Sequence, residues 1–386
     1  MTILPRPRPS EQEIAPSSFS VNLHTGDVQV IDELAAAWRE LCARASDDEP
    51  FYRPEWIAAH VRAFTPHAKL FVITVHHGGE LCLILPLIRN RQVISGVPVR
   101  TLSAPVNSHS CRFDAVRQAG PIGEAAIAAA WNFLKTAKGW DVLDVREVPN
   151  DGTLAALVSL AESERMQTGK IPMRPNPCVA IPAASEISKR LPQNARLRGK
   201  LRQVKREAVA QGDLRLRRVT VAQREDLNQF YKLEASGWKG EAQSAINADA
   251  KTRQFYDEIA NSAEWFGYLS MYFLELDGQL LAAHLGLCYR DVYYSPKLAY
   301  DEEFKQFAPG HLIISSILED CAARGVSLYD ITGPDDEWKL RWTESLRPRS
   351  RFLVFQNGLA GKLAHMMRFR IRPWAKRTMR LGRGKS

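Results

Sequence analysis

The stretch from Tyr293 to Lys339 constrains the fold of this 386-residue chain more than any other part of it. It begins as a strand that ends near Tyr300 and continues into a loop with the sequence Ala308-Pro309-Gly310. A helix follows, because apolar residues recur at the spacing of one buried helical face. These residues are Ile313, Ile314, Ile317, Leu318 and Cys321. Gly325 ends the helix where a left-handed residue is favoured, and the next strand begins at Val326.

The turn before this predicted helix has the properties of an anion-binding site. The first N–H groups of a helix have no partner within the helix, and the helix dipole places partial positive charge at the same end. Gly310 has no Cβ, so an anion can approach the backbone closely. The net charge of +9 is compatible with a phosphorylated cofactor, a nucleic acid or an anionic membrane, and does not choose among them.

The composition excludes several classes of protein. With 45% apolar and 25% charged residues, the chain has enough apolar material for a globular core. Its six cysteines show no metal-binding spacing and favour a reducing compartment over a disulfide framework. Residues 1–20 contain no apolar signal-peptide core, and no apolar run approaches the roughly 20 residues of a membrane span. We therefore expect a cytoplasmic protein without a metal ion.

Helices and strands alternate along the chain, which is typical of an α/β (α+β sandwich) fold, and the length favours two domains. In the first half we expect a strand at 28–31, then two helices, a hairpin that turns at 76–79, and later a strand at 178–181. The second half repeats this order, with a three-stranded meander over 268–299. This repetition predicts an internal structural duplication.

Four short sequence motifs resemble those of a known family. They are LEASGWKGE (233–241), YYSPKLAYDEEF (293–304), APGHLI (308–313) and YDITGPDDEWKLRW (329–342). They are similar to the cellulose-biosynthesis acetyltransferases of the CelD/BcsL type. This family belongs to the GNAT acyltransferases and is related to the FemABX peptidyltransferases, which carry two GNAT-like halves. The likeness covers most of the chain and is strongest from Arg196 to Trp342.

The resemblance implies tandem GNAT-like domains with mixed, largely antiparallel sheets. The expected segments are a disordered tail (1–20), a degenerate GNAT-like domain (21–180), a GNAT acyltransferase domain (181–358) and a basic C-terminal tail (359–386). The second domain would bind acetyl-CoA or another acyl-CoA through the turn residues. These are Ala308, Gly310, His311 and Leu312. The more common GNAT turn has several glycines, whereas here Gln306 precedes one proline and one glycine, so the aminoacyl-tRNA donor of FemABX proteins is an open alternative.

Direct attack of an amine on a thioester requires orientation, polarisation of the carbonyl and removal of a proton. Asp301, at a strand end, is a candidate general base, with a solvated loop or a helix cap as the alternative. Lys297 lies on a predicted central strand, so its charge needs a ligand or a buried ion pair, for which Asp301 and Asp330 are candidates. Tyr300 is a candidate donor to the acyl oxygen or to the leaving thiolate.

Four further residues are candidates for binding the acceptor. Trp238 and Lys239 lie at a helix end that the resemblance assigns to the acceptor cleft, with a helix cap and core packing as the alternative. Asp330, with Lys339 nearby, is a candidate to hold the amine, and its alternative is hydrogen bonding to the following turn.

Two basic segments allow more than one interpretation. The helix at 196–206 is either a solvated face or a contact for an anionic acceptor or the 3′-phosphate of CoA. The C-terminal tail is either disordered or in peripheral contact with an anionic membrane. The chain has no recognisable nucleic-acid module, so we expect no specific nucleic acid. His109, Cys111 and Asp114 are close in sequence, but adjacency does not make a catalytic triad.

The sequence therefore predicts an N-acyltransferase that acts on an amine of a small molecule or of a surface-polysaccharide precursor. Two alternatives remain open: an aminoacyl-tRNA-dependent transferase of the FemABX kind, and a non-catalytic partner of a polysaccharide synthase.

Overall fold

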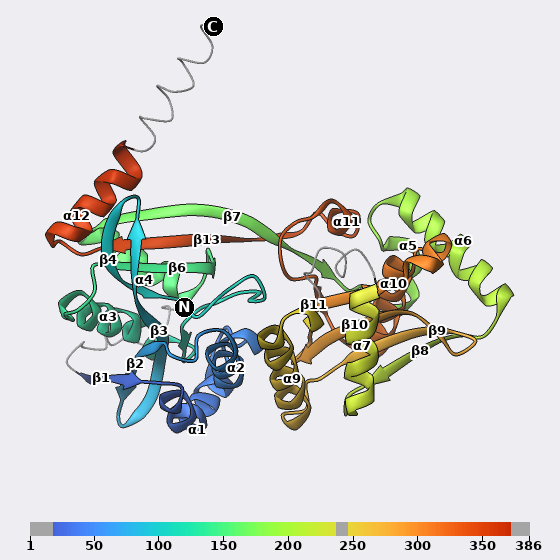
Figure 1. Cartoon of the computed structure of the whole chain (residues 1–386), viewed down its shortest axis with the longest axis horizontal. Helices are drawn as coiled ribbons and strands as arrows, with labels where there is room; N and C mark the ends of the chain where they lie inside the picture. Colours follow the sequence, from blue (N-terminus) through green and yellow to red (C-terminus); the bar gives the residue numbers. More distant parts are fainter. Residues whose placement is uncertain (1–17, 237–245, 372–386) are drawn as a thin grey trace, which may run out of the picture.

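The computed structural model describes residues 18–236 and 246–371 (Figure 1). The first half contains β1 (Phe19–Gly26), α1 (Gln29–Arg44), η2 (Pro50–Tyr52), α2 (Pro54–Phe64), β2 (Lys69–His77), β3 (Glu80–Ile94), β4 (Val97–Ser103), β5 (Val116–Arg117), α3 (Pro121–Thr136), β6 (Val142–Pro149), α4 (Thr153–Ser163) and β7 (Gln167–Ala180).

The second half begins with η3 (Ala184–Glu186), α5 (Ile187–Arg190), α6 (Ala195–Gln211), β8 (Leu214–Val219), α7 (Arg224–Ser236), η4 (Ile246–Ala248) and α9 (Ala250–Trp265). It continues with β9 (Met271–Leu276), β10 (Gln279–Tyr289), β11 (Val292–Tyr300), η5 (Glu302–Phe307), α10 (Pro309–Ala323), β12 (Leu328–Asp330), α11 (Glu337–Leu340) and β13 (Leu346–Phe355). The described chain ends with α12 (Leu359–Met366) and η6 (Met367–Ile371).

The two halves share one sheet because they exchange their last strands. The described strands form a sheet of 13, in the order β1-β2-β3-β4-β6-β13-β7-β12-β11-β10-β9-β8, with β5 attached to β3. β13 pairs with β6 of the first half, and β7 pairs with β12 of the second half. Figure 1 shows β7 and β13 running between the two halves. The predicted domain boundaries remain predictions, and this topology adds that the last strand of each half lies beside strands of the other.

The order of elements supports the predicted duplication. In each half a strand and two helices precede three antiparallel strands, and a helix then leads to a short parallel pairing. The parallel pairs are β4 with β6 and β11 with β12, and the other ladders described are antiparallel. The prediction of a mixed α/β fold with largely antiparallel pairing is confirmed.

The strand predicted at 28–31 is wrong, because the chain is already helical there. The side chain of Asp27 accepts a hydrogen bond from the Gln29 N–H (3.0 Å), which satisfies one N–H at the start of α1. Ile31, Ala35 and Trp38 then form the buried face of this helix. The strand predicted at 178–181 is the end of a much longer one, β7.

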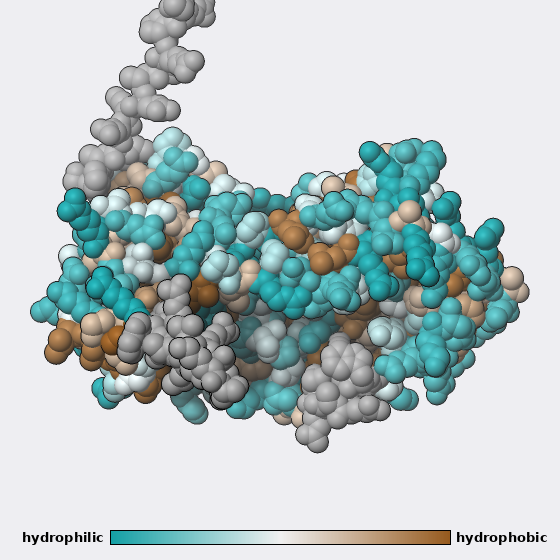
Figure 2. All heavy atoms as spheres, turned by 90° about the horizontal axis from the view of Figure 1, so that it is seen from above, coloured by the Kyte–Doolittle hydropathy of each residue, from teal (hydrophilic) through white to brown (hydrophobic). Residues whose placement is uncertain are grey.

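Helix α10 forms as the apolar spacing predicts. Pro309 is its first residue, and Ala308 before it has a left-handed backbone (φ 48°). The five predicted apolar positions are all buried, and Gly325 has a positive φ of 78° after the helix end. Helix α6 likewise buries apolar residues at every third or fourth position, which are Leu197, Leu201, Val204 and Ala208. Figure 2 shows a largely hydrophilic surface on the face it displays.

Candidate active site

A pocket of about 660 Å³ lies where β11 and β12 separate. Their parallel pairing ends at Tyr294 and Asp330. Beyond that point Ser295 and Pro296 together face the single residue Gly286 of β10, which makes a β-bulge in β11. The bulge redirects β11 away from β12, and the side chains after the bulge line the pocket.

Both halves of the chain contribute to the wall of this pocket. The second half supplies residues 295–298 and Tyr300 from β11, residues 308–311 at the start of α10, and residues 331–334 after β12. The first half supplies residues 108–111, from the loop after β4. The sequence analysis did not place these four residues at the site, because their position depends on how the two halves pack.

The start of α10 offers fewer free donors than predicted. Pro309 has no N–H group, and the N–H groups of His311 and Leu312 donate to the carbonyl of Ala308 (2.9 and 3.0 Å). The side chain of Leu312 is fully buried in the core. Within the described chain, Gly310 therefore has the first-turn N–H that is available to an anion, and Gly310 lines the pocket.

The side chain of His311 adds a donor beside this turn. The indole Nε1 of Trp342 donates to His311 Nδ1 (3.1 Å), so the neutral imidazole carries its proton on Nε2. Burial lowers the pKa of His311 to about 4, and the positive charges of Arg341 and Lys200 lower it further in the same direction. His311 is therefore neutral near pH 7 and lines the pocket as a hydrogen-bond donor.

Lys297 provides a cation within the pocket. Its Nζ lies 4.0 Å from a carboxylate oxygen of Glu234 and 5.4 Å from the centre of the Tyr256 ring. Its side chain is 18% exposed, so the charge is partly desolvated. Lys297 still lines the pocket. The sequence analysis named Asp330 as one candidate partner, but Asp330 pairs elsewhere.

His109, from the first half, lies on the same side as Lys297. Its ring stacks on Phe64 (5.7 Å between centroids, 4° between planes), and its Nδ1 lies 3.2 Å from the hydroxyl of Tyr256. Burial lowers the pKa of His109 to about 4, with a further contribution from the charge of Lys297. The pocket thus contains a second neutral imidazole.

Tyr300 and Asp301 have different surroundings. Tyr300 lines the pocket and is 38% exposed. Its ring lies close to Gly310, since a Cβ on that glycine would be 3.0 Å from Tyr300 Cδ1. Asp301 caps η5 by accepting the Glu303 N–H (2.9 Å) and is not among the described residues that line the pocket. Its surroundings match the helix-cap alternative.

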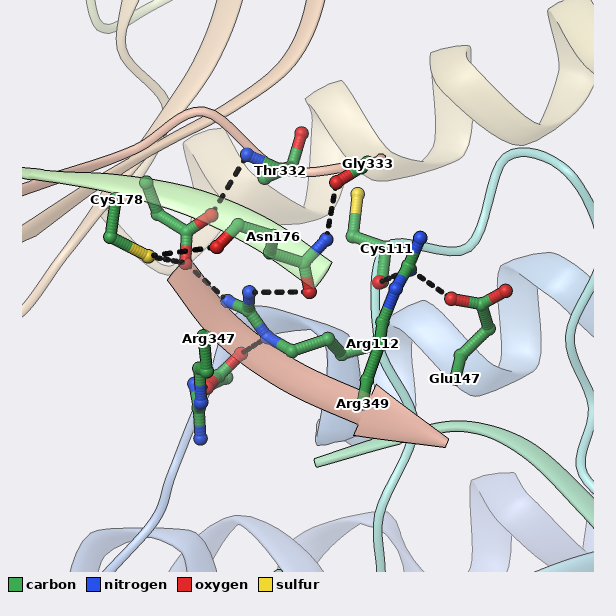
Figure 3. A network of polar contacts seen from close by, with 11 residues as sticks. Cys111, Arg112, Glu147, Asn176, Cys178, Thr332, Gly333, Arg347 and Arg349 are labelled. Carbon is green, nitrogen blue, oxygen red and sulfur yellow. Dashed lines mark hydrogen bonds and ion pairs between the residues drawn. The ribbon is translucent and has the colours of Figure 1, made fainter. Parts of the chain in front are cut away.

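Asp330 is buried in an ion-pair network between the halves. Figure 3 shows this network around Arg112 and Arg347. Arg112 Nη2 lies 2.7 Å from Asp330 Oδ2, and Arg112 Nε donates to Glu49 (2.7 Å). Arg347 also pairs with Glu49. Asp330 accepts the Thr332 N–H as well (2.8 Å), which matches the turn-bonding alternative. Asp330 is not among the described residues that line the pocket, but it is hydrogen-bonded to Thr332, which does line it.

Lys339 holds the turn after β12. Its Nζ donates to the carbonyls of Thr332 (2.8 Å) and Pro334 (2.9 Å), and burial lowers its pKa. Thr332 has a positive φ of 50°, which is strained for a β-branched residue, and its hydroxyl donates to the Ser295 carbonyl (2.7 Å). Lys339 and Thr332 therefore fix the shape of the pocket floor.

Comparison with known proteins agrees with this geometry. Residues 195–340 match the family model described as Acetyltransferase (GNAT) domain. This segment contains the bulged strand, the start of α10 and the separation from β12. This part of the chain is similar to GNAT acetyltransferase domains. No curated protein matches the chain in sequence.

Solved structures share the fold over most of the chain, including most of the half outside the matched segment. The match to the crystal structure of FemX covers 89% of this chain and 100% of the FemX chain, with a TM-score of 0.57 and 13% identity. The C-terminal domain of a putative lysylphosphatidylglycerol synthetase from Agrobacterium fabrum covers 87% and 95%, with a TM-score of 0.52 and 14% identity. A protein of unknown function from Bacteroides thetaiotaomicron covers 87% and 100%, with a TM-score of 0.50 and 8% identity.

Beneath the pocket, the second half contains a chain of buried polar side chains that the sequence analysis missed. Ser295, in the pocket wall, lies 2.7 Å from His284 Nε2, and His284 Nδ1 lies 2.8 Å from the Tyr293 hydroxyl. Tyr293 in turn donates to the carbonyl of Ser270 (3.1 Å). Burial lowers the pKa of His284 to about 3, so this chain is uncharged. It orients the Ser295 hydroxyl at the bulge.

Three sequence candidates lie outside the site or outside the described chain. Trp238 and Lys239 fall in residues 237–245, which the structure does not describe. Asp114 accepts the N–H groups of Thr153 and Leu154 (both 2.8 Å) at the start of α4, far from the role of a triad member. Among the described residues, no three His, Cys, Asp or Glu side chains are grouped as a metal ion would require.

Proposed function

We propose that this protein transfers an acyl group, acetyl by its family resemblance, from acyl-CoA to an amine. The observation that carries the proposal is the separation of β11 from β12 beside the start of α10, which opens the pocket within the GNAT domain. Lys297 and Lys305 line this pocket, and an anionic CoA thioester is favoured by such a cationic wall.

The proposed reaction is direct transfer. The amine nitrogen attacks the thioester carbon, a C–N bond forms, and the C–S bond breaks to release the CoA thiolate. The nitrogen loses one proton and the thiolate gains one, so no oxidant or further reactant is needed. The pocket contributes by holding the two substrates together and by stabilising the charge that develops on the carbonyl oxygen.

We assign three roles within the pocket. Lys297 stabilises the carbonyl oxygen, because it is a partly desolvated cation beside the bulge. Tyr300 donates a proton to the leaving thiolate. His109 accepts the proton from the attacking nitrogen, since it is neutral and lines the pocket, whereas Asp301 caps a helix. A weak base is sufficient for this step, because the nitrogen becomes strongly acidic once it has attacked the carbonyl.

We propose an amine on a small molecule or on a surface-polysaccharide precursor as the acceptor, as the resemblance to cellulose-biosynthesis acetyltransferases implies. The loop at 108–111 supports a polar acceptor, because it brings two serines and His109 to the wall of the pocket. The six cysteines are all free thiols, which supports a cytoplasmic location.

Binding of acetyl-CoA and the Lys297→Met variant test this proposal together. At about 100 times its dissociation constant, acetyl-CoA should raise the free energy of unfolding by about 2.7 kcal/mol. Lys297→Met should lower kcat by roughly 10²-fold, as removal of a single oxyanion donor does, while acetyl-CoA still binds. The matched control is Lys138→Met, outside the pocket lining, which should leave both quantities unchanged. The proposal fails if calorimetry detects no binding of acetyl-, propionyl- or longer acyl-CoA.

A second candidate is transfer from an aminoacyl-tRNA. Two observations favour it: the single available N–H at the start of α10, and the exposed arginines of α6, among them Arg202 and Arg206. In this case tRNA should bind, and the logarithm of its binding constant should fall steeply with the logarithm of the salt concentration. Binding of acyl-CoA but not of tRNA would exclude this candidate.

A further inference from the structure

The C-terminal segment of the protein accounts for its net positive charge. Residues 359–386 contain no aspartate or glutamate. Their cations are Lys362, Arg368, Arg370, Arg372, Lys376, Arg377, Arg380, Arg383 and Lys385. These nine charges equal the net charge of +9 of the whole chain, so residues 1–358 carry no net charge. The net positive charge of the chain therefore comes from this segment.

The described part of this segment is a helix with two different faces. Gly361 and Ala364 of α12 are buried against the first half, and a Cβ on Gly361 would lie 2.3 Å from the Gln356 carbonyl. On the opposite face, Leu359, Leu363 and Met366 are 86%, 39% and 40% exposed. Their spacing of four and three residues places them in one stripe. The inner face thus fixes the helix, and the outer face presents apolar side chains to the surroundings.

We propose that α12 and η6 dock on an anionic phospholipid bilayer. An exposed apolar stripe bordered by lysine and arginine is the combination by which helices lie in a membrane interface. Lys362, which precedes Leu363 in α12, is exposed, and so is Arg370 in η6. Their long side chains can reach lipid phosphates while the stripe enters the acyl boundary. Within the described residues, no helix is long and apolar enough to cross a bilayer.

The apolar stripe distinguishes a bilayer from a nucleic acid. Cations and hydrogen-bond donors bind the phosphate backbone of a nucleic acid, and aromatic side chains stack on its bases. Exposed aliphatic side chains contribute to neither contact. The three exposed apolar side chains of α12 are two leucines and one methionine. The same cations next to an aliphatic stripe therefore favour lipid.

This surface is separate from the proposed site of acyl transfer. Figure 1 shows α12 at the end of the molecule opposite α6 and α10. α12 packs on β4, β7 and β13 and contributes no residue to the pocket. Docking through α12 would hold the protein at the membrane and leave the pocket accessible, whichever donor the pocket takes.

Co-sedimentation of the full chain with vesicles tests the inference. Vesicles of phosphatidylcholine with about a third phosphatidylglycerol should bind the protein at least tenfold more tightly than phosphatidylcholine alone. The variant Leu359→Ser/Leu363→Ser/Met366→Ser should bind anionic vesicles at least tenfold more weakly than the unaltered chain. The matched control, Val209→Ser/Val221→Ser, removes two valines that are 58% and 67% exposed elsewhere and should bind like the unaltered chain.

Two outcomes would overturn the inference. One is a lack of preference for anionic vesicles. The other is equal binding by the triple variant and the unaltered chain, with displacement by excess tRNA, which would identify the tail as a nucleic-acid contact. Leu359→Asp repeats the test at the most exposed position in case the triple variant melts at a lower temperature. Because acetyl-CoA binding is measured separately, a failure here is distinguishable from a failure of the proposed reaction.

Discussion

The two halves of the molecule place an aspartate at the same position and neutralise it in the same way. Asp144 ends the parallel pairing of β6 with β4, and Asp330 ends that of β12 with β11. Asp144 pairs with Arg351 on β13, whereas Asp330 pairs with Arg112 from the loop after β4. Each aspartate thus receives its arginine from the other half, which parallels the exchange of the last strands.

The halves differ in the path of the chain after this aspartate. β6 continues to Pro149 and stays paired with β13, so the strands of the first half do not separate at this point. β12 ends at Asp330, and Thr332 and Gly333 turn the chain away with positive φ values of 50° and 59°. β6 and β12 are the corresponding strands of the two halves, and the pocket lies in the half where this strand ends early and the chain leaves the sheet.

The largest effect is expected from breaking the ion pair of the second half. Arg112→Met leaves Asp330 and Glu49 as buried charges without this partner, and it should lower the free energy of unfolding by about 3–5 kcal/mol. Arg351→Met, the counterpart, should cost only about 1.5–3 kcal/mol, because the Arg351 side chain is 23% exposed and water can replace it. Urea denaturation measures both values. Adding Asp330→Asn should restore part of the loss in the Arg112 variant, and equal losses for the two arginines would contradict the comparison.

The next effect tests whether the interlocked halves unfold as one unit. His60 in the first half and His284 in the second are buried, and burial lowers their pKa values to about 4 and about 3. The unfolded chain binds a proton on each near pH 6.5, whereas the folded protein does not. The free energy of unfolding therefore rises with pH between the folded and unfolded pKa values. Each histidine should lower it by up to about 2 kcal/mol as the pH falls from 6.5 to 5.

His284→Gln and His60→Gln should each flatten this dependence to a similar degree. The readout is the slope of the free energy of unfolding against pH, which a constant loss of packing does not alter. His67→Gln, at an exposed position, is the control and should leave the slope unchanged. A slope that responds to one histidine only would mean that the halves unfold independently despite their exchanged strands.

Local patterns were sufficient to predict much of the second half. The spacing of Ile313, Ile314 and Ile317 predicted α10, and the Asp277-Gly278 turn lies between β9 and β10 as the meander requires. The first half was predicted less well. The helix signal of Val28 to Ile31 was mistaken for a strand, because three apolar side chains within four residues suit both structures.

The composition of the site could be predicted only in part, because several contacts join residues far apart in the sequence. Lys297, Tyr300 and Gly310 lie within one continuous stretch and do line the pocket. The loop at 108–111 reaches it only through packing of the halves. In the same way Arg112, which pairs with Asp330, lies more than 200 residues away from it in the chain, and no local pattern links the two.

The smallest effect is expected at the helix starts that correspond in the two halves. Gly120-Pro121-Ile122 begins α3, and Ala308-Pro309-Gly310 begins α10. Gly310→Val places a Cβ 3.0 Å from Tyr300 and two methyl groups at the pocket wall, so the KM for the acyl donor should rise about tenfold, or 1.4 kcal/mol. Ile122→Val in the first half should instead cost about 0.5–1.5 kcal/mol of stability and leave KM unchanged. Steady-state kinetics and urea denaturation of both variants separate the two effects. If Ile122→Val raised KM as Gly310→Val does, the first half would have a share in donor binding and the contrast between the two halves would be lost.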